Sequence, residues 1–356
     1  MATQLTFDNL FSAVYSTTAT AVKTKDFTRS DPWVVLMPRF ATLCSASFEA
    51  SHASCLEDFR RIGTQKITTA GSYGAFILSS CGLSTTSTDT ATNAQSERLA
   101  ALELLYHTYY HSTKGKESVW IVSIPTNYST WPHTRFKNAT VGDILIALNG
   151  GLAEKFSLED RKHIATAAQT GLAWTLKALV VLDDLSSGGN AMTLLKRWFG
   201  DNTTTEIQLT NFVANLRAGL RKVANKLNGG TAVVTDFVPI RGSTEVDDQK
   251  ARKANAFVVA AEAQNVIYIE EGFFSVGAKN VFQTRSHHWA RIMVHEMTHR
   301  EAATEDKRYG WAGIGPSTGK ISPADAMVNA DSWAIFVADA AGAMTVGDIS
   351  RATNGA

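Results

Sequence analysis

The chain has 356 residues, of which 44% are hydrophobic and 19% are charged, enough for two globular domains with cores of their own. Its 34 basic and 33 acidic residues nearly cancel, which argues against nucleic acid as a partner. No stretch approaches the roughly 18 consecutive apolar residues of a membrane span, and the N-terminus lacks the basic and apolar regions of a signal peptide. We therefore expect synthesis in the cytoplasm and any export to follow a non-classical route.

Residues 1–150 form a first region to which the sequence assigns no fold. Residues 82–93 are polar and of low complexity, which is typical of an exposed loop. An odd number of unevenly spaced cysteines argues for buried free thiols rather than a disulfide framework or a zinc finger; they are Cys44, Cys55 and Cys81. The Gly150-Gly151 pair marks the predicted boundary with a second domain at 151–356.

The second region predicts long helices followed by a small sheet. Helical periodicity covers residues 158–182 and 205–227, and strands are expected at 232–238, 257–260 and 266–270. A further helix is then expected to begin at a cap provided by Ser286. This order of elements predicts the α+β class.

That last helix contains the motif from which a function is inferred. His295, Glu296 and His299 form the pattern H-E-x-x-H. Residues four apart share one face of a helix, so both imidazoles can bind the same metal ion, with the glutamate beside it. One zinc ion held in this way activates a water, and Glu296 is the expected general base. The motif predicts peptide-bond hydrolysis.

Catalytic zinc usually takes three protein ligands and a water, so a further ligand is needed. The extended motif with a third histidine is absent, because Ala302 and Glu305 stand at the relevant positions. Glu301 and Glu305 are exposed-helix charges by default, and each remains a weaker candidate for the third ligand than the nearby Asp306.

Beyond the motif, residues 303–310 read A-T-E-D-K-R-Y-G and residues 329–332 read N-A-D-S. Here the chain resembles the aspzincins, the deuterolysin and peptidyl-Lys metalloendopeptidase family, whose signature is H-E-x-x-H followed by G-T-x-D-x-x-Y-G and N-A-D-S. The resemblance runs from about Phe156 to Phe336. It implies a zincin-like metallopeptidase domain, preceded by an N-terminal domain of unassigned fold.

Carried over residue by residue, the resemblance makes Asp306 the third zinc ligand and Tyr309 the phenol that stabilises the oxyanion. Asp331 matches the first of two acids that meet the substrate lysine in the Lys-specific members, whereas Ala334 replaces the second. This departure argues against strict lysine specificity. Asp331 has a second interpretation, as the hydrogen-bond acceptor of a ligand histidine. Ala303 replaces a glycine of the signature and should affect only the turn.

Residues 315–320 resemble a phosphate-binding loop only superficially. Ile314 and Ile321 stand where that loop requires a glycine and a hydroxyl residue. We expect this segment to form a loop over the cleft instead.

Two classes of function remain open from the sequence. The first is a zinc endopeptidase acting on protein or peptide substrates, with delivery as a toxin or effector as a variant. In that variant, residues 1–150 would engage a secretion system or an inhibitor. The second is a non-catalytic protein of zincin fold that binds a partner through its N-terminal region.

Overall fold

The computed structural model describes residues 154–230, 232–236, 254–258, 266–274 and 284–355, residues 136–150, and shorter stretches between 78 and 123. The chain divides into two compact units; the first comprises 1–113, 120–158 and 235–251, and the second 114–119, 159–234 and 252–356. The boundary expected near residue 150 stays a prediction. The three cysteines lie outside the described residues.

In the first unit, residues 82–92 are mostly exposed, as predicted, and Thr90 is bridged to Thr140. Helix α7 (Val141–Gly150) follows that bridge, and the Asp143 N–H donates to Thr140 Oγ1 at its start. The short strands β1 (Thr113–Gly115) and β2 (Val119–Val122) are neighbours in a sheet, and the division of the chain into units falls within both of them.

The second unit places long helices before strands, which confirms the mixed α+β class. The helices are α8 (Leu158–Val181), α9 (Asn190–Phe199) and α10 (Glu206–Asn228). The strands β3 (Ala232–Thr235), β4 (Ala256–Phe257) and β5 (Val266–Ile269) lie in the order β3-β5-β4. β4 is antiparallel to β5, with Ala256 opposite Ile269. The elements that follow are α12 (Glu271–Phe274), α13 (Arg285–Ala302), η1 (Gly310–Ala312), η2 (Pro316–Thr318), α14 (Pro323–Val328), α15 (Ala330–Ala340) and α16 (Val346–Asn354).

Helix α10 forms where its apolar periodicity predicted. Thr205 caps it, and a capping box joins the Thr205 and Gln208 side chains to each other's backbone N–H groups. The buried face repeats at helical spacing and consists of Leu209, Val213, Leu216, Leu220, Val223 and Leu227. At Gly219, α10 approaches Trp333 of α15 so closely that a β-carbon would lie 2.6 Å from the indole ring.

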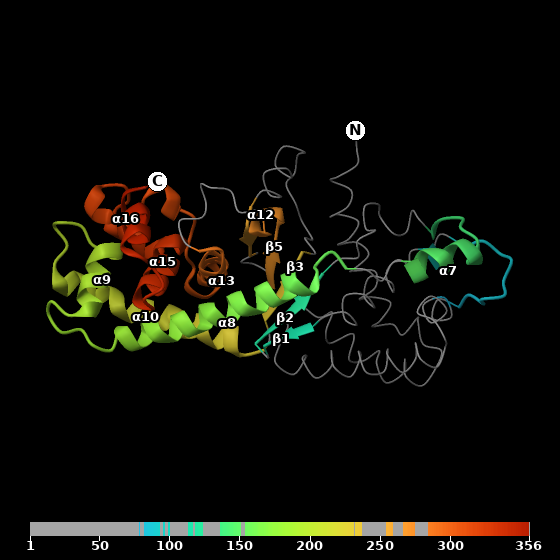
Figure 1. The fold of residues 1–356 in the computed structure, drawn as a ribbon, viewed down its shortest axis with the longest axis horizontal. Helices are drawn as coiled ribbons and strands as arrows, with labels where there is room; N and C mark the ends of the chain where they lie inside the picture. The colour runs from blue at the N-terminus through green and yellow to red at the C-terminus, as the bar shows by residue number, and fades with distance from the viewer. Residues whose placement is uncertain are drawn as a thin grey trace. The chain divides into compact units, whose positions relative to one another are not determined.

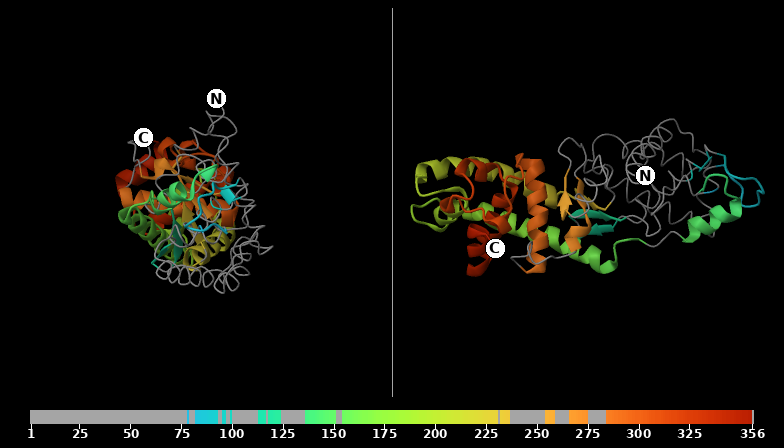
Figure 2. Two further views of the ribbon diagram at one scale, coloured as in Figure 1. Left: turned by 90° about the vertical axis from the view of Figure 1, so that its right-hand side faces the viewer. Right: turned by 90° about the horizontal axis from the view of Figure 1, so that it is seen from above.

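Helix α8 is long and apolar enough to cross a membrane by length and composition alone. Half of its most apolar 18-residue window is buried inside the protein, however, so this is weak evidence for a span. It runs crosswise to α13 (Figures 1 and 2) and approaches it closely at Gly171. A β-carbon at Gly171 would lie 3.1 Å from Val294 Cγ2 and 3.2 Å from Ala290 O. α8 therefore packs as a core helix against the helix that carries the metal motif.

Helix α13 begins two residues earlier than predicted. Thr284, with extended backbone, is its N-cap, whereas Ser286 lies within the first turn. Both are hydroxyl residues suited to a cap, so their side chains alone could not decide between them. The Trp289 indole N–H donates to Phe273 O at 2.8 Å and ties the helix to α12. Residues 288–298 are buried throughout.

The prediction of a loop over the cleft at 315–320 is wrong. This segment contains η2 and is bonded to the C-terminal end of α16, with Gly315 N–H donating to Thr353 O at 3.1 Å and Ile314 N–H to Ala352 O at 2.8 Å. Ile314 is fully buried and Pro316 is buried as well. Burial of these two apolar side chains anchors the start of the segment, whereas residues 317–320 are exposed.

Ala303 ends α13 in the left-handed conformation, with φ 53° and ψ 38°. A side chain with a β-carbon is strained there, so Ala303→Gly should raise the free energy of unfolding by roughly 0.5–1 kcal/mol. Chemical denaturation measures the change. The same substitution at the exposed helical position Ala214 should lower stability by about 1 kcal/mol, and a loss of stability at position 303 would contradict the interpretation.

Candidate metal centre and active site

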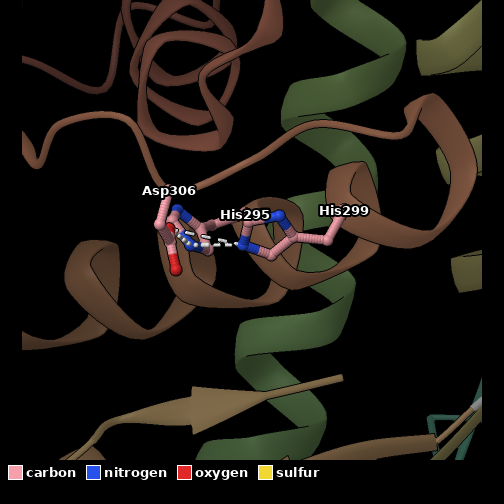
Figure 3. A group of neighbouring side chains, drawn as sticks. All are labelled: His295, His299 and Asp306. Atoms are coloured by element: carbon pink, nitrogen blue, oxygen red, sulfur yellow. Dashed lines mark hydrogen bonds and ion pairs between the residues drawn. The ribbon is translucent and has the colours of Figure 1, made fainter. Parts of the chain in front are cut away.

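Helix α13 presents two imidazoles one turn apart, and an aspartate from the next segment meets them. Asp306 Oδ1 lies 3.1 Å from His295 Nε2 and 3.4 Å from His299 Nε2, and these two nitrogens are 3.0 Å apart. Figure 3 shows the three side chains pointing toward one another. Their candidate ligand atoms all lie within 4.8 Å of one another. The structure therefore brings together the three residues expected to hold a metal.

The hydrogen bonds behind the rings decide which nitrogens face the centre. His299 Nδ1 lies 2.8 Å from Thr304 O, and a carbonyl can only accept, so Nδ1 carries the hydrogen. His295 Nδ1 lies 2.8 Å from Asp331 Oδ1 and is the donor by the same argument. When both rings are neutral, the lone pair on each Nε2 therefore faces the other ring's Nε2 and the Asp306 carboxylate. Such electron pairs repel unless a cation lies between them, and the donor set suits zinc.

The residues around the three side chains favour a positive charge at this point. Burial opposes protonation of His295, but hydrogen bonds to Asp306 and Asp331 outweigh it and raise its pKa to about 10. Burial acts to raise the pKa of Asp306, yet hydrogen bonds from His295 and His299 hold it well below its usual range. The carboxylate is therefore ionised and available as a ligand.

Asp331 lies beneath the metal centre and is 1% exposed. Its Oδ1 accepts hydrogen bonds from His295 and from the Arg291 guanidinium, and its Oδ2 accepts the Gly310 N–H at 2.7 Å. Burial acts to raise its pKa, but the positive Arg291 and the bond from His295 bring it below the usual range. Asp331 thus orients a candidate ligand ring, the second of its two predicted interpretations, and both oxygens are engaged within the protein.

Asn329, the first residue of N-A-D-S, holds the segment that carries Asp306. Its Oδ1 accepts the N–H groups of Lys307 and Arg308 at 3.1 and 3.0 Å, and its Nδ2 donates to Arg308 O at 2.9 Å. Glu305 forms an isolated parallel bridge with Asn329. Contacts with Asn329 therefore hold the residues immediately before and after Asp306 in the sequence. Sequence reasoning missed this role, although a polar residue at the start of the apolar α15 was a usable signal.

The weaker candidates for the third ligand have other partners. Glu305 pairs with Lys307 at 2.7 Å, and Glu301 lies 4.0 Å from Arg300. Neither belongs to the metal-capable group found among the described residues.

Glu296 is 4% exposed, and its Oε2 has no hydrogen-bond partner. Burial raises the pKa of this carboxyl. Both properties suit a group that exchanges a proton with a reacting water.

The ring of Tyr309 is nearly parallel to that of His295, and the two ring centroids are 6.3 Å apart. Burial and the nearby Asp306 raise the pKa of the phenol, which therefore stays protonated near neutral pH and can donate.

A cavity of about 280 Å³ opens beside these groups. Its described lining includes His295, Glu296, Asp306 and Tyr309, together with Arg291, Asp331, Ala254, Asn255, Ala256, Ile292 and Trp311. Two of the three candidate ligands, the candidate base and the candidate oxyanion donor therefore share one space that can admit a substrate.

Arg291 was not identified from the sequence. Its guanidinium contacts Asp331 and lies 3.4 Å from His288 Nδ1. Burial and the positive Arg291 lower the pKa of His288 to about 3, so this ring is neutral. The available signal was spacing, because Arg291 precedes His295 by one turn on the same helix face.

Two imidazoles one helical turn apart, a glutamate beside them and a following aspartate are compatible with a metallopeptidase domain. Residues 184–338 match the aspzincin family model, described as lysine-specific metallo-endopeptidase. The resemblance read from the sequence is thereby confirmed over this range, which begins later than the expected Phe156. The family implies a zinc-binding metalloendopeptidase with protein or peptide substrates. No curated protein matches the chain.

Replacing Asp306 tests the third ligand. Asp306→Ala removes an oxygen donor from a set of three, so zinc affinity should fall at least about tenfold. Elemental analysis after dialysis against a weak chelator measures the retained metal. Glu305→Ala removes the adjacent carboxylate and should leave zinc content unchanged, whereas equal losses in both variants would contradict the assignment.

Proposed function

We propose that the protein is a zinc-dependent endopeptidase, with one zinc ion held by His295, His299 and Asp306. The observation that carries the proposal is the convergence of three metal-capable atoms, two of which belong to residues that line a cavity, His295 and Asp306. Next to them, Glu296 Oε2 is buried and has no hydrogen-bond partner. An open coordination place next to a general base distinguishes a catalytic zinc site from a structural one.

When bound, zinc lowers the pKa of a water toward about 7 and polarises a carbonyl. Glu296 accepts the proton of the attacking water and later delivers it to the leaving amine. Tyr309 donates a hydrogen bond as negative charge develops on the substrate oxygen. Asp331 keeps the His295 ring in the orientation that directs Nε2 to the centre, and Thr304 O does the same for His299.

The other interpretations from the sequence make different predictions. A non-catalytic zincin-fold binding protein would retain its function after loss of Glu296, because its partner would contact the N-terminal region. Delivery as a toxin or effector, the partners of residues 1–150 and the non-classical export route stay predictions.

Glu296→Gln tests the proposed chemistry. Glutamine keeps the size of the side chain but cannot accept the proton, so kcat should fall by roughly 10²–10⁴-fold while zinc content is unchanged. Hydrolysis of an unstructured protein substrate, followed by mass spectrometry, measures the rate. A variant as active as the wild type would exclude Glu296 as the base.

Tyr309→Phe tests the oxyanion donor. Removing the hydroxyl should lower kcat by roughly 10²-fold or more with little effect on KM, because the hydrogen bond strengthens only in the transition state. Zinc content is the control. An equal increase in KM with constant kcat would show instead that Tyr309 binds the ground state.

A further inference from the structure

The turn that carries Tyr309 is closed by the side chain of the preceding residue. The Arg308 guanidinium donates to Ala312 O from Nη2 and to Gly313 O from Nε, both at 2.6 Å. A guanidinium presents its N–H groups in a fixed plane, so two such bonds hold a turn more firmly than one would. Within the turn, the Ala312 N–H donates to Tyr309 O at 2.9 Å. Tyr309 therefore begins a turn that Arg308 closes.

The end of the same turn is bonded to the C-terminal end of α16. The last carbonyls of a helix have no donors within the helix and need partners elsewhere. In α16, Ala352 O and Thr353 O accept the N–H groups of the two residues that follow Gly313, at 2.8 and 3.1 Å. Gly313 itself lies against the helix end, since a β-carbon there would lie 2.6 Å from the carbonyl carbon of Asn354. Helix α16 therefore fixes the position at which the turn ends.

The position of the Tyr309 hydroxyl depends on this turn. Tyr309 is 43% exposed, so packing confines its ring incompletely. The Gly310 N–H donates to Asp331 Oδ2 at 2.7 Å and joins the turn to the buried carboxylate that orients His295. An oxyanion donor must lie within about 3 Å of the oxygen on which charge develops, so a small displacement of the turn would weaken its hydrogen bond.

We infer that Arg308 and the end of α16, residues 352–354, form a brace that positions the Tyr309 hydroxyl for oxyanion stabilisation. Arg308 is a positioning residue, because it acts through Tyr309 and is not among the described residues that line the cavity. The inference rests on the proposed peptidase function. The aspzincin match ends at residue 338 and α16 begins at Val346, so part of the brace lies outside the matched range.

Arg308→Met tests the brace independently of activity. Methionine keeps much of the aliphatic side chain and removes both donors, so the amides of residues 312–315 should exchange at least about tenfold faster. Hydrogen exchange with mass spectrometry on the full-length protein measures the change, with the amides of α13 as the internal reference. Arg221 is exposed on α10, and Arg221→Met removes the same group outside the turn. Unchanged exchange in a folded Arg308→Met protein would overturn the inference.

A double-mutant cycle shows whether the brace acts through the Tyr309 hydroxyl. In the zinc-loaded wild type, Arg308→Met should lower kcat at least about fivefold with little change in KM. In the Tyr309→Phe background, the same substitution should lower kcat less than about twofold, because the hydroxyl that the brace positions is already absent. Equal losses in both backgrounds, at equal zinc content, would indicate a general structural effect and overturn the inference.

The two measurements separate the inference from the function on which it rests. If exchange rises in Arg308→Met but the wild type cleaves no unstructured protein substrate, the peptidase function fails while the brace on the turn stands. If the wild type is active and exchange stays at the wild-type rate in Arg308→Met, the brace alone fails.

Gly313→Ala supplies a second variant if Arg308→Met does not fold. A β-carbon at Gly313 would lie 2.6–2.8 Å from the backbone of residues 354–355 and would push the turn away from α16. Gly319→Ala is the matched control, because Gly319 has a similar φ, 71° against 79°, and an added β-carbon there meets nothing within 4 Å. Gly313→Ala should reproduce the faster exchange and the loss of kcat, whereas Gly319→Ala should leave both near the wild-type values. Equal effects of the two substitutions would overturn the role of α16.

Discussion

One buried carboxylate links the parts on which the metal centre depends. Asp331 projects from the start of α15 and accepts hydrogen bonds from Arg291 and His295 of α13 and from the Gly310 N–H. These three donors belong to segments that are distant in sequence from α15. A buried anion without such donors would be strongly destabilising, so the carboxylate requires both α13 and the segment at Gly310 to be in place. The orientation of a candidate ligand is thereby coupled to the packing of the domain.

The candidate metal centre brings together electron pairs that repel one another unless a positive charge lies between them. Backbone and side-chain acceptors hold the Nδ1 hydrogens of both imidazoles, which leaves the Nε2 lone pairs facing Asp306. A proton on His295 relieves this repulsion, as the raised pKa of that ring indicates. A divalent cation relieves it more completely. Metal binding and proton release are therefore linked at this site.

Two carboxylates that line the cavity have different surroundings. Glu296 retains an oxygen without a hydrogen-bond partner, while the nearby Asp331 has its charge balanced by Arg291. Two carboxylates of the same cavity thus have different roles because their neighbours differ. One is suited to proton transfer, and the other supports a ligand. The match to the aspzincin family model supports metalloendopeptidase chemistry at this cavity.

The sequence by itself determined the metal helix, its two histidines and the glutamate, because residues four apart share a helix face whatever surrounds them. The resemblance added Asp306 and Tyr309, and periodicity predicted α10 almost to its ends. Only the tertiary structure decided the hydrogen-bond partners of Asp331 and Asn329, the role of Arg291 and the packing of residues 315–320 against α16. These features join groups more than 20 residues apart, such as His295 and Asp331 at a separation of 36. Local spacing carries no information about such contacts, because they form only when the helices pack.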